Sequence, residues 1–306
     1  MSVESLPPLK KAFPRLREIL EPQALREIIE AAHGLKASRL CVLESRAARL
    51  VGALESCGLW VTLHDRKQLL FEDAGKGGWI SGYGIETELE FPREGYLHLY
   101  AGRDPEAVLT AKKAEHSSDM AKFAEILAYP KCCAEFYSRN LETAESAQGD
   151  FILPLLTETM RNRDDASPLF PFWTNMAAQY FDYGLLSFYP CSFFCQEAIG
   201  KSKRALSLIQ LYDAELAAKF VEVARSPVLY TEYEGVYRFL GARRRGNQIS
   251  YRGVEQTLDG VLGHLLSSGD RIEVLSSRSV RVFAGDNLLA SLDAPSLGMM
   301  IFDGDA

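Results

Sequence analysis

Two segments of this chain place a proline between a tyrosine and a pair of cysteines. Residues 129–133 read Tyr-Pro-Lys-Cys-Cys, and residues 189–195 read Tyr-Pro-Cys-Ser-Phe-Phe-Cys. Proline has no amide hydrogen and a fixed φ, so it suits the first position of a helix. We therefore expect a helix to begin at Pro130 and another at Pro190, with cysteines in the first turn or just beyond it.

The start of a helix favours cysteine in its thiolate form. Unpaired amides and the helix dipole stabilise negative charge there, typically by ~0.3–1 kcal/mol, and the thiolate is the form that binds metal or attacks. Cys191 and Cys195 are four residues apart, which predicts one helix face for both. Cys132 and Cys133 are adjacent, about 100° apart on a helix. Both can reach one metal only if the first turn is irregular.

Three interpretations of the cysteines remain open at this point. They could ligate zinc or an iron–sulfur cluster through three or four thiolates, form a dithiol–disulfide pair, or be small buried hydrophobes. A Tyr-Pro dipeptide precedes both pairs of cysteines, and this repetition favours one metal site shared by the two pairs. The spacing fits neither C-x₂-C zinc patterns nor the ferredoxin run. We favour a 4Fe-4S cluster, with zinc as the alternative, because a cluster accepts ligands from separate helix starts and gains from aromatic shelter. That shelter would come from Phe188, Tyr189, Phe193 and Phe194.

The same two segments resemble the signatures of an uncharacterised prokaryotic family, known only as a domain of unknown function. The family signatures are similar to Gly-Tyr-Pro-x-Cys-Cys and Pro-Cys-Ser-x-x-Cys-Glu, and the resemblance covers about residues 94–200. This chain departs from them by having Ala128 in place of the glycine and Gln196 ahead of Glu197. The resemblance implies that Cys132, Cys133, Cys191 and Cys195 belong to one site. It implies no activity.

Composition and charge limit the partners. Hydrophobic residues make up 47% and charged residues 25% of the 306 residues, as in an ordinary globular protein. The 34 basic and 41 acidic residues give a net charge of −7, which argues against broad binding to nucleic acid or an anionic membrane. No long apolar run predicts a membrane span, and the N-terminus is unlike a secretory signal. We expect a cytoplasmic protein, where reducing conditions disfavour disulfides.

The patterning predicts an α+β fold in three regions. Residues 1–128 form an N-terminal α/β region with a helical arm, residues 129–225 a helical metal-thiolate region, and residues 226–306 a small α+β C-terminal domain. In the first region we expect a single helix over residues 104–127, with Asp104 as N-cap and Pro105 at the first position. The other expected elements are helices at 44–57, 201–223 and 254–266, strands at 59–63, 68–71, 96–100, 236–240, 248–251, 272–275, 280–283 and 288–292, and a glycine-rich hairpin or loop at 75–84.

Several charged residues are candidates for supporting chemistry. Glu135 and Glu197 follow the two cysteine groups and could act as a general base or as a partner of a metal ligand, although a solvated helix face is the simpler explanation of both. His116 is a weaker catalytic candidate, since a straight helix would hold it about 24 Å from Cys132. The remaining cysteines, Cys41 and Cys57, are expected in the core. Arg243, Arg244 and Arg245 suit a solvated turn or, alternatively, a phosphate grip.

The sequence hypothesis is a cytoplasmic metalloprotein, an enzyme that acts on a small-molecule substrate by Lewis-acid or sulfur-transfer chemistry. Two alternatives stay open. One is a structural zinc-thiolate protein with a binding role, and the other is a metal-free enzyme with a cysteine nucleophile. The substrate and the oligomeric state are not encoded in any pattern of this sequence.

Overall fold

The computed structural model describes residues 6–72, 76, 79–146, 150–161, 163 and 168–303. The fold is mixed α+β, as the sequence predicts, with helices and three sheets in this part of the chain. Contacts divide the chain into two compact units. The first comprises Met1–Phe71, Trp79–Glu135 and Gly200–Lys219, and the second Glu72–Gly78, Phe136–Ile199 and Phe220–Ala306. The three-region division expected from the sequence stays a prediction.

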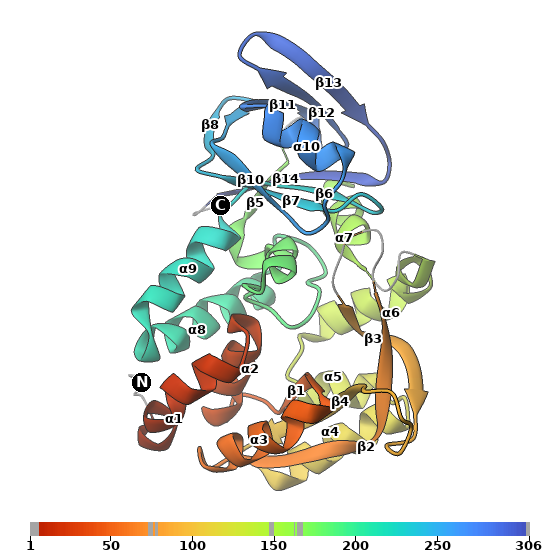
Figure 1. The fold of residues 1–306 in the computed structure, drawn as a ribbon, viewed down its shortest axis with the longest axis vertical. Coiled ribbons are helices and arrows are strands. Elements are labelled where there is room, and N and C mark those ends of the chain that lie inside the picture. Colours follow the sequence, from red (N-terminus) through yellow and green to blue (C-terminus); the bar gives the residue numbers. More distant parts are fainter. Residues whose placement is uncertain are drawn as a thin grey trace. The chain divides into compact units, whose positions relative to one another are not determined.

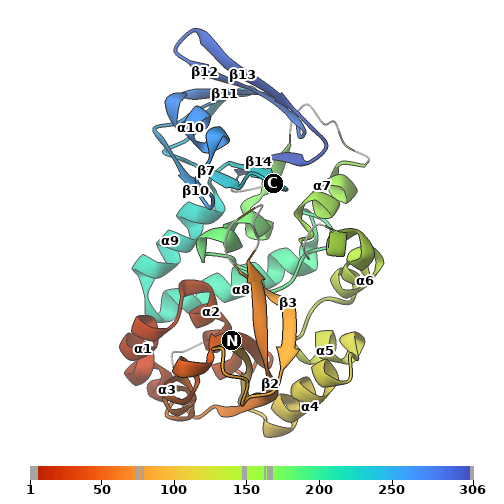
Figure 2. The ribbon, with the colours of Figure 1, turned by 45° about the vertical axis from the view of Figure 1, so that its right-hand side comes forward.

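The first unit contains a four-stranded sheet with the order β1-β4-β2-β3. Its strands are β1 (Ser38–Leu43), β2 (Trp60–Glu72), β3 (Trp79–Thr87) and β4 (Tyr96–Gly102). The two strands expected at 59–63 and 68–71 are one long strand, β2, whose register with β4 shifts between Leu63 and Lys67. Figure 2 shows β2 and β3 side by side. The glycine-rich segment 75–84 contributes to β3, and residues 75, 77 and 78 lie outside the described residues.

Helices cover both faces of this sheet. They are α1 (Pro7–Ile19), α2 (Pro22–Ala32), α3 (Glu44–Glu55), α4 (Pro105–His116) and α5 (Met120–Ile126). Tyr100 of β4 packs with Val108 of α4, whereas Ser38 of β1 donates a hydrogen bond to the Glu27 carbonyl of α2 (2.7 Å). Ser38 pairs with Ala101, the neighbour of Tyr100, and successive side chains of a strand point to opposite faces. It follows that α2 and α4 lie on opposite faces (Figure 1).

The prediction of one helix over residues 104–127 is wrong, although its cap is confirmed. The Asp104 carboxylate accepts from the Glu106 amide at 2.9 Å. The helix ends at His116, because Ser118 adopts a left-handed conformation with φ 57°. The Asp119 carboxylate then accepts from the Lys122 amide at 3.0 Å and caps α5. An aspartate that bonds the backbone in this way starts a new helix instead of continuing the old one.

The central elements are α6 (Lys131–Ser146), α7 (Ile152–Met160), β5 (Leu169–Pro171), the 3₁₀ helices η1 (Phe172–Thr174) and η2 (Met176–Phe181), α8 (Gln196–Tyr212) and α9 (Ala214–Ala224). The helix expected at Pro130 is confirmed, but the helix expected at Pro190 is wrong, since α8 begins only at Gln196. The expected helix over residues 201–223 is interrupted at Asp213, whose carboxylate accepts from the Leu216 amide (2.8 Å) and caps α9.

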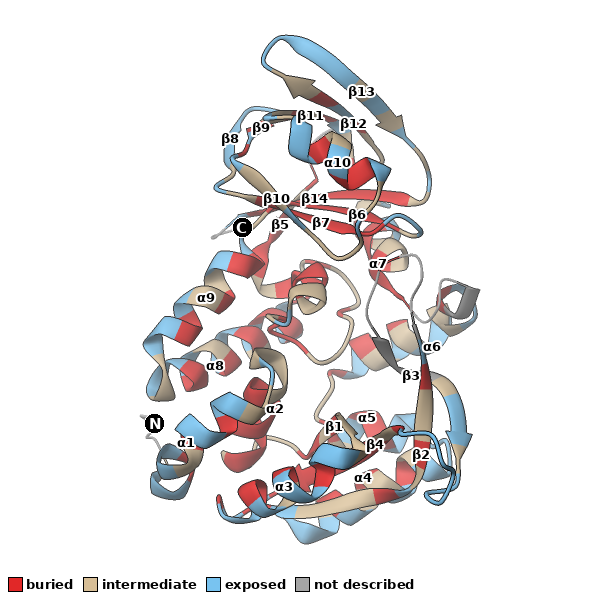
Figure 3. Ribbon diagram, in the orientation of Figure 1, coloured by how far each residue is buried: buried red, intermediate tan, exposed pale blue. Residues whose placement is uncertain are grey.

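The second unit contains two five-stranded sheets, with the orders β10-β7-β6-β14-β5 and β13-β12-β11-β9-β8. Their strands are β6 (Val228–Thr231), β7 (Val236–Leu240), β8 (Arg243–Arg245), β9 (Gln248–Ser250), β10 (Gly253–Gln256), β11 (Arg271–Ser276), β12 (Ser279–Ala284), β13 (Asn287–Asp293) and β14 (Leu297–Asp303). The two sheets and the helix α10 (Val261–Ser268) share one apolar core. Figure 3 shows buried residues along β6, β7 and β14.

Two expectations for the C-terminal region need correction. The helix expected over residues 254–266 begins only at Val261, because residues 253–256 pair with β7 as strand β10. The three arginines expected in a turn instead form the exposed edge strand β8, paired with β9. The strands expected at 236–240, 248–251, 272–275, 280–283 and 288–292 are confirmed. None of the helices in the described ranges combines the length and apolar character that a bilayer crossing requires.

Candidate metal centre

The first cysteine pair is positioned by the turn that ends α5. The Ala128 amide bonds to the Glu125 carbonyl at 2.9 Å, and the Tyr129 amide bonds to the Ala124 carbonyl at 2.8 Å. Ala128 has φ 55°. Together these bonds and the left-handed residue make a Schellman motif, in which glycine is the usual left-handed residue. The motif ends α5 and brings the chain directly to Pro130.

Pro130 then starts α6. Its carbonyl accepts hydrogen bonds from the amides of Cys133 (2.9 Å) and Ala134 (3.0 Å). The three-residue bond to Cys133 tightens the first turn, since such bonds are the 3₁₀ type. In this turn the Sγ atoms of Cys132 and Cys133 lie 3.8 Å apart. Adjacent cysteines can therefore present both sulfurs on the same side of the helix start.

The second cysteine pair belongs to a turn and not to a helix. The Cys195 amide bonds to the Ser192 carbonyl at 3.0 Å, and the Phe194 amide bonds to Ser192 Oγ at 3.2 Å. The Cys195 carbonyl accepts from the Ile199 amide at 2.9 Å, which begins α8. Cys191 and Cys195 thus lie at the two ends of a compact turn, and the expected i, i+4 helical pair is wrong.

Phe193 anchors this turn in the core of the second unit. Its side chain is fully buried and stacks on Phe170, with ring centroids 4.4 Å apart. Its amide donates to Thr159 Oγ1 (3.1 Å), and its carbonyl accepts from Thr174 Oγ1 (2.6 Å). Because both backbone groups and the ring are held, the cysteines on either side are fixed in direction.

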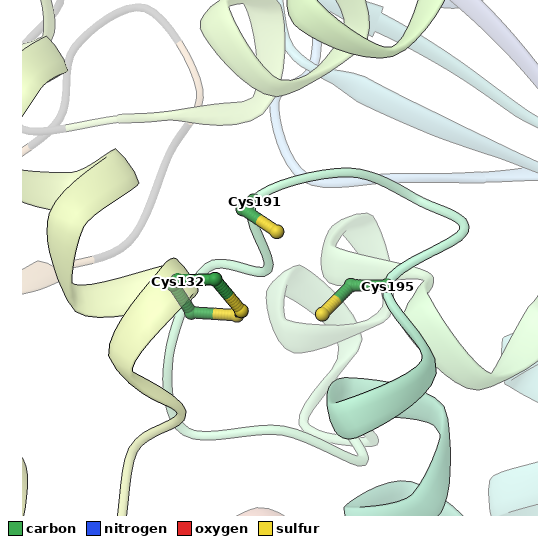
Figure 4. A group of neighbouring side chains, drawn as sticks. Cys132, Cys191 and Cys195 are labelled. Carbon is green, nitrogen blue, oxygen red and sulfur yellow. The ribbon is translucent and has the colours of Figure 1, made fainter.

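The four cysteines expected to share a site come together. One ligand atom from each of Cys132, Cys133, Cys191 and Cys195 lies within 4.8 Å of the others. Figure 4 shows the sulfurs of Cys132, Cys191 and Cys195 pointing toward one another. Cys133 and Cys195 are buried, Cys191 is partly buried, and Cys132 is the most exposed. A group of four thiols at this spacing can bind a metal ion.

Aromatic rings lie beside both cysteine segments, and Tyr189, one of the four residues expected to shelter the site, is among them. Phe151 stacks on Tyr137 of α6 at 4.4 Å and lies 5.0 Å from Tyr189, measured between ring centroids. The Tyr189 hydroxyl accepts from Gln179 Nε2 at 2.9 Å, and burial raises the pKa of Tyr189 well above its usual value. Phe151 and the rings of Tyr137 and Tyr189 therefore pack together next to the two cysteine segments.

The acid–base candidates lie at exposed positions. Glu135 on α6 is 3.9 Å from Lys131 Nζ, and its side chain is 60% exposed. Glu197 lies exposed in the first turn of α8. His116 ends α4, and its ring lies 5.6 Å from that of His64. Their proposed chemical roles stay predictions.

Cys41 and Cys57 lie apart from the four-cysteine group. Burial raises the pKa of Cys41 to about 11 and also raises the pKa of the Cys57 thiol. The Cys57 thiol donates to the Ala53 carbonyl at 3.2 Å. A thiol with a raised pKa carries little thiolate at neutral pH. Cys57 is buried, as expected for a core residue, whereas Cys41 is only partly buried.

One polar cluster was not anticipated from the sequence. Arg39 of β1, His98 and Tyr100 of β4 all contact the Glu115 carboxylate of α4, with Arg39 Nη2 at 2.9 Å and His98 Nδ1 at 3.3 Å. The His64 ring lies 6.2 Å from that of His98. The alternation of polar residues along β1 and β4 is the only signal for it in the sequence, and it does not identify the partner helix.

Comparisons of the chain with protein-family models, with curated proteins and with solved structures found no match. The resemblance of the two cysteine signatures to an uncharacterised family therefore stays a prediction.

Proposed function

We propose that the four cysteines hold one tetrahedral zinc ion. A zinc–sulfur bond of about 2.3 Å places the sulfurs of a tetrahedral site about 3.8 Å apart. The Cys132–Cys133 sulfur separation is 3.8 Å, and all four ligand atoms lie within 4.8 Å of one another. This spacing carries the proposal, because it matches a single ion.

A 4Fe-4S cluster is the second candidate. A cubane binds each thiolate through a different iron, so its cysteine sulfurs stand farther apart, roughly 6 Å. The exposure of Cys132 beside three more protected cysteines favours this candidate. If Cys132 were exchanged for substrate, the iron freed by it would act as a Lewis acid in an enzyme. The sulfur–sulfur separations, at most 4.8 Å here, would have to increase by roughly an ångström or more to accept the cluster.

The zinc centre would have a structural role in a protein that binds another molecule. Four thiolates fill a tetrahedral site and leave no open position for substrate, as in closed zinc sites. The ion would tie the first turn of α6 to the turn that precedes α8. A reducing, cytoplasmic compartment, which we expect from the sequence, would keep all four thiols available.

Metal analysis of protein purified without air tests the proposal. We expect one equivalent of zinc per chain, a colourless solution and no labile sulfide. Cys132→Ser and Cys191→Ser should each lower bound zinc, whereas Cys41→Ser, the matched control, should leave it unchanged. Brown protein with iron and labile sulfide would support the cluster instead. Protein without zinc or iron would refute both metal proposals.

A further inference from the structure

A buried group of charged side chains lies on α2 and in the loop that follows it. Arg26 Nη1 is 2.8 Å from a Glu27 carboxylate oxygen and 3.0 Å from a Glu30 oxygen. Lys36 Nζ reaches the same two carboxylates, at 2.5 and 3.4 Å. Arg26 is 2% exposed. Two cations and two carboxylates thus form a charge-balanced quartet in the interior of the first unit.

The lysine of this quartet stays charged. Burial acts to lower the pKa of Lys36, but the carboxylates of Glu27 and Glu30 outweigh burial, and the pKa lies above its usual value. Lys36 Nζ and Arg26 Nη1 both lie within ion-pair distance of the two carboxylates. Both ion pairs of Arg26 are made by Nη1.

The other two nitrogens of Arg26 have no partner. Nε and Nη2 are both buried and neither makes a hydrogen bond within the described residues. These two atoms form one edge of the guanidinium plane, which is the edge that grips carboxylate or phosphate with two parallel hydrogen bonds. Buried charged donors are costly to leave unpaired. An unpaired fork in the interior indicates a ligand with two acceptor oxygens.

The quartet lies close to the segment that carries the first cysteines. Tyr129 is near enough to Lys36 to interact with it electrostatically. The Ala37 amide bonds to the Ile126 carbonyl at 3.4 Å, which holds the loop after α2 against the end of α5. Tyr129 directly precedes Pro130 and the first turn of α6. Arg26 and Lys36 share the carboxylates of Glu27 and Glu30, and Lys36 in turn interacts with Tyr129, which precedes the cysteine-bearing helix.

We propose that Arg26 binds the oxyanion of a small molecule, a carboxylate or a phosphate group, through Nε–H and Nη2–H, beside the metal-thiolate centre. This placement rests on the proposed metal function, whereas the oxyanion site itself does not need the metal. A zinc ion with four thiolate ligands has no open position for a small molecule. The Arg26 site would therefore be the place where this protein binds one.

Titration of the full-length, metal-loaded protein with sodium phosphate and with sodium acetate tests this site. Sodium chloride at matched ionic strength is the reference. We expect at least one oxyanion to bind, and at ten times its dissociation constant to raise the melting temperature by about 2–4 °C. The phosphate and acetate arms identify which oxyanion the site prefers. No rise above the chloride reference with either anion would refute the proposal.

Arg26→Lys keeps the charge that faces Glu27 and Glu30 but removes the fork. We expect it to weaken anion binding about tenfold or more, while Arg17→Lys on α1, half exposed and paired with Asp213, binds like the wild type. Equal binding by wild type and Arg26→Lys would overturn the proposal. If Arg26→Lys does not fold, a crystal structure of the wild-type protein grown in phosphate tests whether an anion occupies the site. Anion density within hydrogen-bond distance of Nε and Nη2 supports the site, and water alone there refutes it.

Metal content, measured in the same samples, separates this proposal from the previous one. Anion binding at Arg26 in a protein that holds no metal would support the oxyanion site and refute the metal proposal. A zinc-loaded protein that binds neither anion would support the metal proposal and refute the oxyanion site.

Discussion

Replacing Ala128 by glycine should stabilise the turn that delivers the first cysteine pair. Ala128 is the left-handed residue of the Schellman motif that ends α5, with φ 55°. Its Cβ is strained in this conformation, since the left-handed region places Cβ too close to the following carbonyl oxygen. Glycine has no Cβ and adopts the same φ freely. Ala128→Gly therefore removes strain without removing either of the two hydrogen bonds of the motif.

The magnitude follows from two opposing terms. A left-handed conformation costs an L-residue roughly 1–2 kcal/mol. Glycine has more conformational freedom than alanine in the unfolded chain, and this lowers the free energy of unfolding by roughly 0.5–1 kcal/mol. The net stabilisation is about 0.5–1 kcal/mol, which raises the melting temperature by about 1–2 °C in a protein of this size. Metal content should not change, because Ala128 provides no ligand.

Urea unfolding of the metal-loaded protein, followed by circular dichroism, measures this difference. The matched control is Ala48→Gly at an exposed position inside α3, where the same substitution should destabilise by about 1 kcal/mol. Opposite signs for the two variants support the turn geometry. Equal destabilisation of both would mean that Ala128 is helical or extended, and the account of how α6 begins would be wrong.

Two further predictions concern the thiols and the polar cluster on β4. Cys195→Ser should abolish stoichiometric metal binding, and Cys57→Ala should leave the metal content unchanged, as elemental analysis of both variants would show. Burial acts to raise the pKa of Glu115, but the hydrogen bond from His98 and the charge of Arg39 outweigh burial and hold that pKa below its usual range. The carboxylate therefore stabilises the fold above about pH 4.3, and this contribution is lost as the pH falls toward the lowered pKa. We expect Glu115→Gln to cost about 3 kcal/mol at pH 7 and to flatten the acid dependence of unfolding. An unchanged acid dependence would contradict this assignment.

Local sequence was sufficient where one residue decides the backbone. Asp104 caps α4 and Pro130 precedes α6, as predicted, because the aspartate carboxylate and the proline ring act within their own turn. The grouping of the four cysteines was also predictable, since two unusual segments repeat the same order of residues. The mixed fold class follows from strands and helices that alternate along the chain.

Local sequence failed where distant residues decide. Pro190 looks like Pro130, yet no helix begins there, because Thr159 and Thr174 bond the backbone of Phe193 and the core of the second unit buries its ring. These partners are far from Phe193 in the sequence and form no pattern with it. The unpaired fork of Arg26 was equally invisible, because only the packing of α2 shows that the arginine is buried.

The two cysteine pairs are oriented by different devices, and neither device needs a metal. On one side a Schellman turn and a proline fix the start of α6. On the other side a buried phenylalanine fixes a turn whose last residue begins α8. Since both turns are held by backbone hydrogen bonds and apolar burial, little chain entropy is left for the ion to remove. Metal binding at such a site would add to an existing fold, in contrast to zinc fingers, which fold only when the metal binds.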